Sequence, residues 1–152
     1  MRLRGKPWRE AGIHLLLSVF DSTGAIRGLR GWRFGKEQPK RTAMAGFSVK
    51  GLILADMWGV AMLRGEGHPR NVLITEGEPD FLVAATRWGL LEEPRTATIG
   101  VVAGAWSEDL AARVPSGCTV ILATDHDAAG ERYAASIAAT LADRCVLQRT
   151  IP

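Results

Sequence analysis

The sequence has few of the residues that define several common protein classes. Its 152 residues include two cysteines, Cys118 and Cys145, and no C-x-x-C pair. It can therefore build neither a disulfide framework nor a zinc ribbon, and we expect two reduced thiols in the core of a cytoplasmic protein. His14 and His68 have no cysteine partner and no histidine four residues away, which argues against a zinc site.

The sequence also lacks long apolar runs and the P-loop motif of ATP-driven helicases. The run from Leu15 to Phe20 has only the length of a strand, and no small-residue cleavage site follows it, so we expect no signal peptide. No segment is apolar for long enough to span a membrane. A G-x-x-x-x-G-K-[ST] motif is absent, so ATP-driven unwinding is not encoded.

The remaining composition is that of a folded protein. Hydrophobic residues make up 47% of the chain, enough to fill the core of one domain, or of one domain with a small subdomain. The net charge of +3 is compatible with a polyanionic partner but is also ordinary for an arginine-rich chain.

The chain is organised around one strand that ends in two aspartates. Residues 120–123 form an unbroken apolar run between Gly117 and Gly130, which predicts a strand buried on both faces and hence a parallel sheet. Asp125 and Asp127 lie at its carboxyl end, and the residues after them recur at helical spacing.

A second unit of the same kind lies upstream. The apolar run 72–74 leads to Glu76, and apolar residues at helical spacing follow Pro79, which suits the first position of a helix. If the two strands are neighbours, Glu76, Asp125 and Asp127 converge outside their carboxyl ends. Carboxylates that repel one another need a cation, and oxygen ligands suit Mg²⁺.

The pattern Glu76-Gly77-x-x-Asp80 followed by Asp125-x-Asp127-x-Ala129-Gly130 resembles the TOPRIM domain of bacterial DnaG-type primases, topoisomerases and related nucleases, with the primases closest. The resemblance implies that Asp125 and Asp127 hold Mg²⁺, with Mn²⁺ as an alternative. It implies that Glu76 handles protons or binds the metal. Gly77 and Gly130 match family glycines.

Some of the acidic residues could be either metal ligands or residues that stabilise a turn or a helix start. Asp125 and Asp127 alone could be a turn and a helix cap, and only their combination with Glu76 and Asp80 favours a metal site. Asp80 could be a metal ligand or a favourable charge at a helix start. Glu78 and His126 match no fixed position of the family pattern, and we expect both to be solvated.

The N-terminal part is predicted to be a basic hairpin. Strands over residues 13–20 and 25–34 flank a turn at 21–24. Its arginines, including Arg30 and Arg33, alternate with aromatic residues, which fits either nucleic-acid binding or a solvated edge strand. The primase resemblance includes the Asp21-x-x-Gly24, Pro39-Lys40 and Lys50-Gly51 elements, and it implies that Lys40 and Lys50 hold phosphates.

These patterns predict an α/β fold. A TOPRIM-type parallel sheet flanked by helices, residues 69–152, follows a small mixed α+β subdomain with a β-hairpin, residues 1–68. Apolar residues between Leu54 and Met62 predict a core helix, Ser107 is expected to cap a short helix, and residues 145–148 to form a last strand. The alternating order of strands and helices predicts right-handed parallel crossovers.

The leading hypothesis is a primase-type nucleotidyltransferase core that makes primers on a single-stranded DNA template from nucleoside triphosphates, with a replicative helicase as an optional further partner. The alternatives are a metal-dependent TOPRIM nuclease and a nucleic-acid-binding module without turnover. Because the primase zinc ribbon and downstream helical region are missing, we expect a fragment of a larger primase or a minimal primase-like protein of a phage or mobile element.

Overall fold

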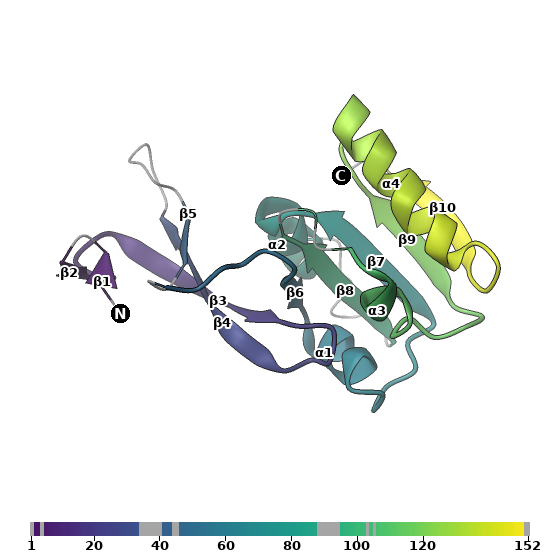
Figure 1. The fold of residues 1–152 in the computed structure, drawn as a ribbon, viewed down its shortest axis with the longest axis horizontal. Helices are drawn as coiled ribbons and strands as arrows, with labels where there is room; N and C mark the ends of the chain where they lie inside the picture. Colours follow the sequence, from purple (N-terminus) through teal and green to yellow (C-terminus); the bar gives the residue numbers. More distant parts are fainter. Residues whose placement is uncertain are drawn as a thin grey trace.

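One mixed sheet of eight strands organises the computed structural model, which describes residues 2–3, 5–33, 41–43, 46–87, 95–102, 104 and 106–150. The strand order is β10-β9-β7-β8-β6-β3-β4-β5. Helices lie against the parallel strands, and the N-terminal hairpin extends the sheet at its other end (Figure 1). The predicted α/β fold class is confirmed.

The C-terminal half is the parallel part of the sheet. Strand β7 pairs in parallel with both β8 and β9, and β9 pairs in parallel with β10. All six residues of β8 are buried, as expected for a strand covered on both faces. The elements are β7 (Asn71–Glu76), α2 (Glu78–Arg87), β8 (Thr96–Val101), α3 (Glu108–Ala111), β9 (Thr119–Ala123), α4 (Ala128–Leu141) and β10 (Val146–Thr150).

The N-terminal half is antiparallel. Its strands are β3 (Ile13–Phe20), β4 (Ile26–Arg33), β5 (Arg41–Ala43) and β6 (Ile53–Ala55), and a separate pair is formed by β1 (Arg2–Leu3) and β2 (Lys6–Pro7). The predicted hairpin is β3-β4, and β6 joins it to β8 in antiparallel register. Strands from both predicted domains thus share one sheet, and the division at residue 68 stays a prediction.

The helix predicted between Leu54 and Met62 begins later than expected. Helix α1 spans Met57–Leu63, whereas Leu54 belongs to strand β6. Asp56 starts the helix, because its Oδ1 accepts a hydrogen bond from the amide of Gly59 at 2.6 Å. Met57, expected in the core stripe, is 79% exposed. Among the described residues, no helix is long and apolar enough to cross a membrane.

Candidate active site

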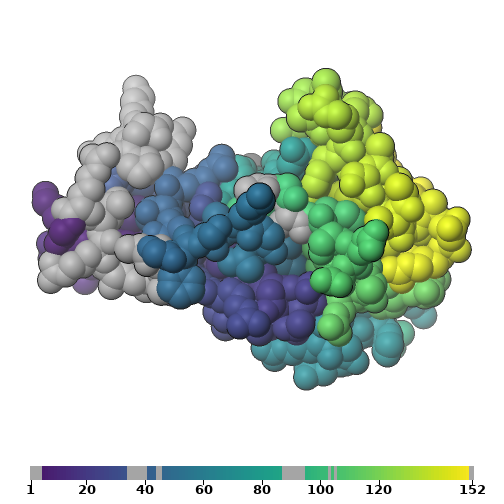
Figure 2. Space-filling view, in the orientation of Figure 1, coloured from purple at the N-terminus to yellow at the C-terminus, as the bar shows by residue number. Residues whose placement is uncertain are grey.

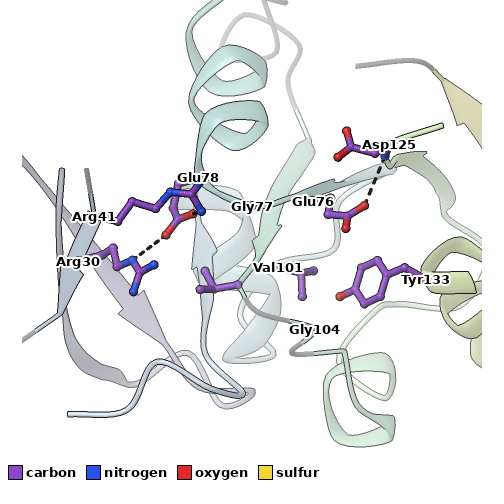
Figure 3. Close-up of a pocket in the computed structure, with 10 residues that line it drawn as sticks. Arg30, Arg41, Glu76, Gly77, Glu78, Val101, Gly104, Asp125 and Tyr133 are labelled. Atoms are coloured by element: carbon purple, nitrogen blue, oxygen red, sulfur yellow. Dashed lines mark hydrogen bonds and ion pairs between the residues drawn. The ribbon is translucent and has the colours of Figure 1, made fainter. Parts of the chain in front are cut away.

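Glu76 and Asp125 lie at the carboxyl ends of two neighbouring strands. Glu76 is the last residue of β7, and Asp125 follows the end of β9 by two residues. The strands pair with Thr75 opposite Ala123, so both acids reach the same edge of the sheet. The backbone amide of Asp125 donates a hydrogen bond to Oε2 of Glu76 at 3.4 Å (Figure 3). The structure therefore brings these two predicted site residues together.

Asp127 caps helix α4. Its Oδ1 accepts hydrogen bonds from the backbone amides of Ala129 and Gly130, both at 2.8 Å. The amides of Gly130 and Ala129, and then the charge of Arg132, lower the pKa of the Asp127 carboxyl. The side chain is exposed, and these two bonds occupy one of its oxygens. The cap and ligand interpretations of Asp127 are therefore compatible.

The four predicted acids share one electrostatic environment. Burial raises the pKa of Glu76, and the charges of Asp125, Asp127 and Asp80 raise it further, although the hydrogen bond from the Asp125 amide opposes them. Asp80 lies in the first turn of α2, where burial and the charge of Asp125 raise its pKa. Carboxylates that disfavour each other's ionisation attract a proton or a cation.

The donor chemistry of this edge fits a hard divalent ion. Mg²⁺ commonly takes one or two carboxylates and keeps several waters, and carboxylate and water oxygens suit Mn²⁺ as well. Over the part of the chain that the structure describes, no three Asp, Glu, His or Cys side chains form a group that could hold one ion. The residues thus fit an ion bound by one or two carboxylates, with water completing its shell.

A pocket of about 350 Å³ lies between this acidic edge and the N-terminal strands. Glu76, Asp125 and Tyr133 line one side of it, while Arg30 and Arg41 line the other (Figure 3). The molecular surface is hollowed between the N-terminal strands and α4 (Figure 2). A ligand in this pocket would meet acidic groups on one wall and basic groups on the opposite wall.

Glu78 was expected to be solvated, but its side chain is buried. Its side chain is 1% exposed, and its two oxygens pair with Arg30 Nε at 2.7 Å and Arg41 Nη1 at 3.2 Å. The expectation was wrong because both partners come from distant strands, β4 and β5, which no local pattern around Glu78 reveals. Arg41 was not predicted to be a site residue. The signal that could have indicated it is its position directly after the Pro39-Lys40 element.

Arg33 and Lys50, two of the other predicted basic residues, are not among the residues that line the pocket. Arg33 donates from Nη2 to the backbone carbonyl of Ala11, at the far end of the hairpin from its turn. Lys50 is exposed in a turn before β6, where its backbone amide donates to Ser48 Oγ at 3.2 Å. Lys40 falls outside the described residues. His126 is exposed, as expected.

Tyr133 was not predicted to belong to the site, but it lines the pocket from α4. Its hydroxyl oxygen is buried and makes no hydrogen bond of normal geometry with a described residue. Burial, together with the negative charge of Glu76, raises the pKa of the phenol, although the backbone of Trp106 lies close enough to oppose this shift. Tyr133 is therefore a protonated donor at neutral pH and a poor nucleophile.

Gly77 and Gly130 are required to be glycine for different structural reasons. Gly77 has a φ of +90°, a conformation that L side chains rarely adopt, and it makes the turn from Glu76 into α2. Gly130 packs against Asp125 so closely that a Cβ there would lie 2.0 Å from the Asp125 carbonyl oxygen. Both glycines hold the backbone that carries the acidic residues.

Several solved primase structures share this fold. A DnaG primase catalytic domain bound to ssDNA matches 90% of this chain and 43% of its own, with 19% identity and a TM-score of 0.61. The Escherichia coli primase catalytic core matches 82% of this chain and 38% of its own, with 19% identity and a TM-score of 0.54. The zinc-binding and RNA polymerase domains of Aquifex aeolicus primase match 90% of this chain and 33% of their own, with 17% identity and a TM-score of 0.54.

The chain spans less than half the length of each of these structures. No curated protein matches it. A family model described as Toprim-like matches residues 73–152, which are 80 of the 152 residues and include the four acids and both glycines described above. The chain therefore belongs to the Toprim-like family, and its fold is that of DnaG-type primase catalytic cores.

Proposed function

We propose that this chain is a primase-type nucleotidyltransferase core that makes short primers on single-stranded DNA from nucleoside triphosphates. The observation that carries the proposal is the pocket that faces Glu76 and Asp125 on one side and two arginines of the N-terminal strands on the other. A substrate that combines phosphates with a divalent ion matches both walls. In this proposal, residues 1–68 supply the basic surface and residues 69–152 the acidic one.

Each acidic residue has a distinct task in the proposal. One or two of Asp125, Asp127 and Asp80 would bind Mg²⁺ directly and the others through its water ligands, and Glu76 would take part as a ligand or as the group that accepts a proton. Burial and the neighbouring carboxylates raise the pKa of Glu76, which is the direction that favours a role in proton transfer. When bound, the ion neutralises phosphate charge during an in-line displacement.

The basic residues bind phosphates in the proposal. Arg30 lines the pocket and meets the substrate directly, whereas Arg33, Lys40 and Lys50 belong to the surface that follows the template strand. Fixed positive charges stabilise the charge that develops on transferring phosphoryl groups. The match to a primase domain bound to ssDNA supports the choice of template.

The decisive experiment is primer synthesis on a single-stranded template with labelled nucleoside triphosphates, with Mg²⁺ and with EDTA. We expect product only with the metal, and a loss of about 100-fold or more in the Asp125→Asn/Asp127→Asn variant, because removed electrostatic stabilisation typically costs that much. Asp143→Asn, at an exposed residue beyond α4, is the matched control. Equal synthesis by wild type and the double variant would reject the proposal.

A Mg²⁺-dependent nuclease is the second candidate. It is favoured by the family match, which covers residues 73–152 and leaves out the N-terminal strands, because hydrolysis needs only the acidic edge. Nicking of plasmid DNA without nucleotides, lost in the same double variant, would support it over primer synthesis. Binding that falls steeply with salt, needs no Mg²⁺ and leads to no product would instead indicate a module without turnover.

A further inference from the structure

Glu78 is the only charged side chain that is fully buried among the described residues. A buried carboxylate is costly unless charged partners and hydrogen bonds compensate it. Its two partners come from different strands of the N-terminal half, Arg30 from β4 and Arg41 from β5. The cluster carries two positive charges and one negative charge, so it remains cationic.

The contacts fix the two guanidinium groups without using all of their donors. The hydrogen bonds to Glu78 use Nε of Arg30 and Nη1 of Arg41. The guanidinium of Arg41 also stacks over the ring of Trp32, 5.3 Å from its centroid. Both arginines line the pocket, and Figure 3 shows them with Glu78 on the side opposite Glu76 and Asp125. Among the described residues, their other guanidinium N–H groups have no hydrogen-bond partner besides Glu78, and we expect these groups to meet a ligand in the pocket.

We infer that Glu78 is a positioning residue, which holds Arg30 and Arg41 as a fixed pair that binds a phosphate group across the pocket from the acidic edge. Guanidinium groups recognise phosphate through paired N–H donors, which need a fixed orientation. The inference rests on the proposed function for its ligand class. The phosphate could belong to a DNA strand or to a triphosphate, and the experiment distinguishes these two sources.

A purely structural role for Glu78 makes the opposite prediction for binding. Glu78→Gln adds one positive charge next to the pocket, so electrostatics alone would strengthen the binding of any polyanion. If Glu78 orients the arginines, the same variant weakens phosphate binding in spite of that added charge. The sign of the change in affinity therefore separates the two roles, independently of catalytic activity.

The experiment measures the affinity of a fluorescent single-stranded oligonucleotide by anisotropy, with inorganic triphosphate as a competitor. We expect Glu78→Gln to bind the phosphate-bearing probe about threefold to tenfold more weakly than wild type, the loss that follows when a charge-assisted contact is misplaced. If the strand is the ligand, the salt slope falls by about 0.7 for each lost contact. If triphosphate is the ligand, Glu78→Gln binds the oligonucleotide as wild type does, but more inorganic triphosphate is needed to displace it.

Matched variants keep the test informative. Glu66→Gln removes the same charge from an exposed turn and should bind at least as tightly as wild type, and thermal unfolding establishes that each variant is folded. Should Glu78→Gln fail to fold, Arg41→Lys serves instead, because Arg41 is 48% exposed and lysine keeps the charge but not the paired donors. Weaker binding by Arg41→Lys supports the inference, and unchanged binding overturns it.

Failure of the positioning role can be distinguished from failure of the proposed function. Glu78→Gln that folds and binds both the oligonucleotide and inorganic triphosphate as tightly as wild type, or more tightly, overturns the positioning role but leaves the proposed function intact. Wild-type protein that binds neither the oligonucleotide nor inorganic triphosphate overturns both. In the Arg30→Gln/Arg41→Gln background, Glu78→Gln should produce no additional weakening, and an additional loss there would contradict the inference.

Discussion

Gly130 lies directly against Asp125, because a Cβ built on Gly130 would stand 2.0 Å from the carbonyl oxygen of Asp125 and 2.8 Å from its carbonyl carbon. Gly130 is not among the glycines with positive φ, so the requirement at this position is for space and not for an unusual conformation. The first turn of α4 and the turn that carries Asp125 are thus packed backbone to backbone.

Gly130→Ala should therefore force these two segments apart. We expect the free energy of unfolding to fall by about 1–3 kcal/mol, as for other substitutions that overpack a site, and Mg²⁺ affinity to fall because Asp125 moves. Denaturant unfolding and metal titration measure the two effects. Ala129→Ser, at the exposed neighbouring position, should change stability by less than about 0.5 kcal/mol. A Gly130→Ala protein as stable as wild type would contradict the packing.

Glu76→Gln should stabilise the metal-free protein. Burial and the charges of Asp125, Asp127 and Asp80 raise the pKa of Glu76 above its usual value of 4.5. Between the unfolded and folded pKa values the folded protein binds more protons, so its stability falls as pH rises through this window. Above this window the Glu76 carboxylate is therefore destabilising, and we expect a higher Tm for Glu76→Gln than for wild type in EDTA.

Mg²⁺ should reverse this order. Binding to the folded state alone stabilises wild type by about 2.7 kcal/mol when the free ion is at 100 times its Kd, and the variant should gain less. Thermal melts with and without Mg²⁺ test both statements. A variant that melts below wild type in EDTA, or that gains as much from the ion, would show that Glu76 does not belong to a shared acidic site.

The strands and helices of the C-terminal half could be predicted from the sequence because local signals agree there. The run 120–123 is apolar throughout and is bounded by glycines, and the structure forms β9 over Thr119–Ala123. Glu76 and Asp125 could be placed together on the condition that their strands are neighbours, because parallel strands leave their carboxyl ends at one edge; β9 does lie beside β7, although β8 separates them in the sequence. No contact between specific side chains was needed for that inference.

Contacts between distant segments were beyond sequence reasoning. The burial of Glu78 depends on Arg30, 48 residues away, and on Arg41, 37 residues away, and an acidic residue at a helix start is usually solvated. Leu54 fitted a helical stripe with later residues, but pairing of β6 with β8 outweighs that periodicity. Both errors arose because tertiary pairing overrides a local pattern.

Asp127 offers a comparison between capping and metal binding. Asparagine keeps an oxygen that can accept from the amides of Ala129 and Gly130, whereas alanine does not. We expect Asp127→Asn to melt close to wild type but to bind Mg²⁺ about tenfold more weakly, because a ligand carboxylate is replaced by a neutral group. Asp127→Ala should lose both properties. If Asp127→Asn retains full Mg²⁺ affinity, Asp127 is a cap and not a ligand.

Asp21 should make the stability of the hairpin depend on pH. Burial opposes its ionisation, but hydrogen bonds from Thr23, Arg27 and the backbone amide of Ala25 lower its pKa from 3.8 to about 2. A depressed folded pKa contributes stability that is fully present above pH 3.8 and is lost as pH falls through about 2. Asp21→Asn should therefore melt below wild type at pH 7, since asparagine makes a weaker acceptor for Arg27.

The difference in Tm between wild type and Asp21→Asn should shrink between about pH 4 and pH 2, where the wild-type carboxyl becomes protonated. Thermal melts across this range measure it, with Asp143→Asn as a control at an exposed acid whose difference from wild type should stay small throughout. A gap that persists unchanged below pH 2 would mean that the charge of Asp21 does not stabilise the turn. Because this turn connects β3 to β4, which carries Arg30, its loss should also weaken the anchoring of the basic wall of the pocket.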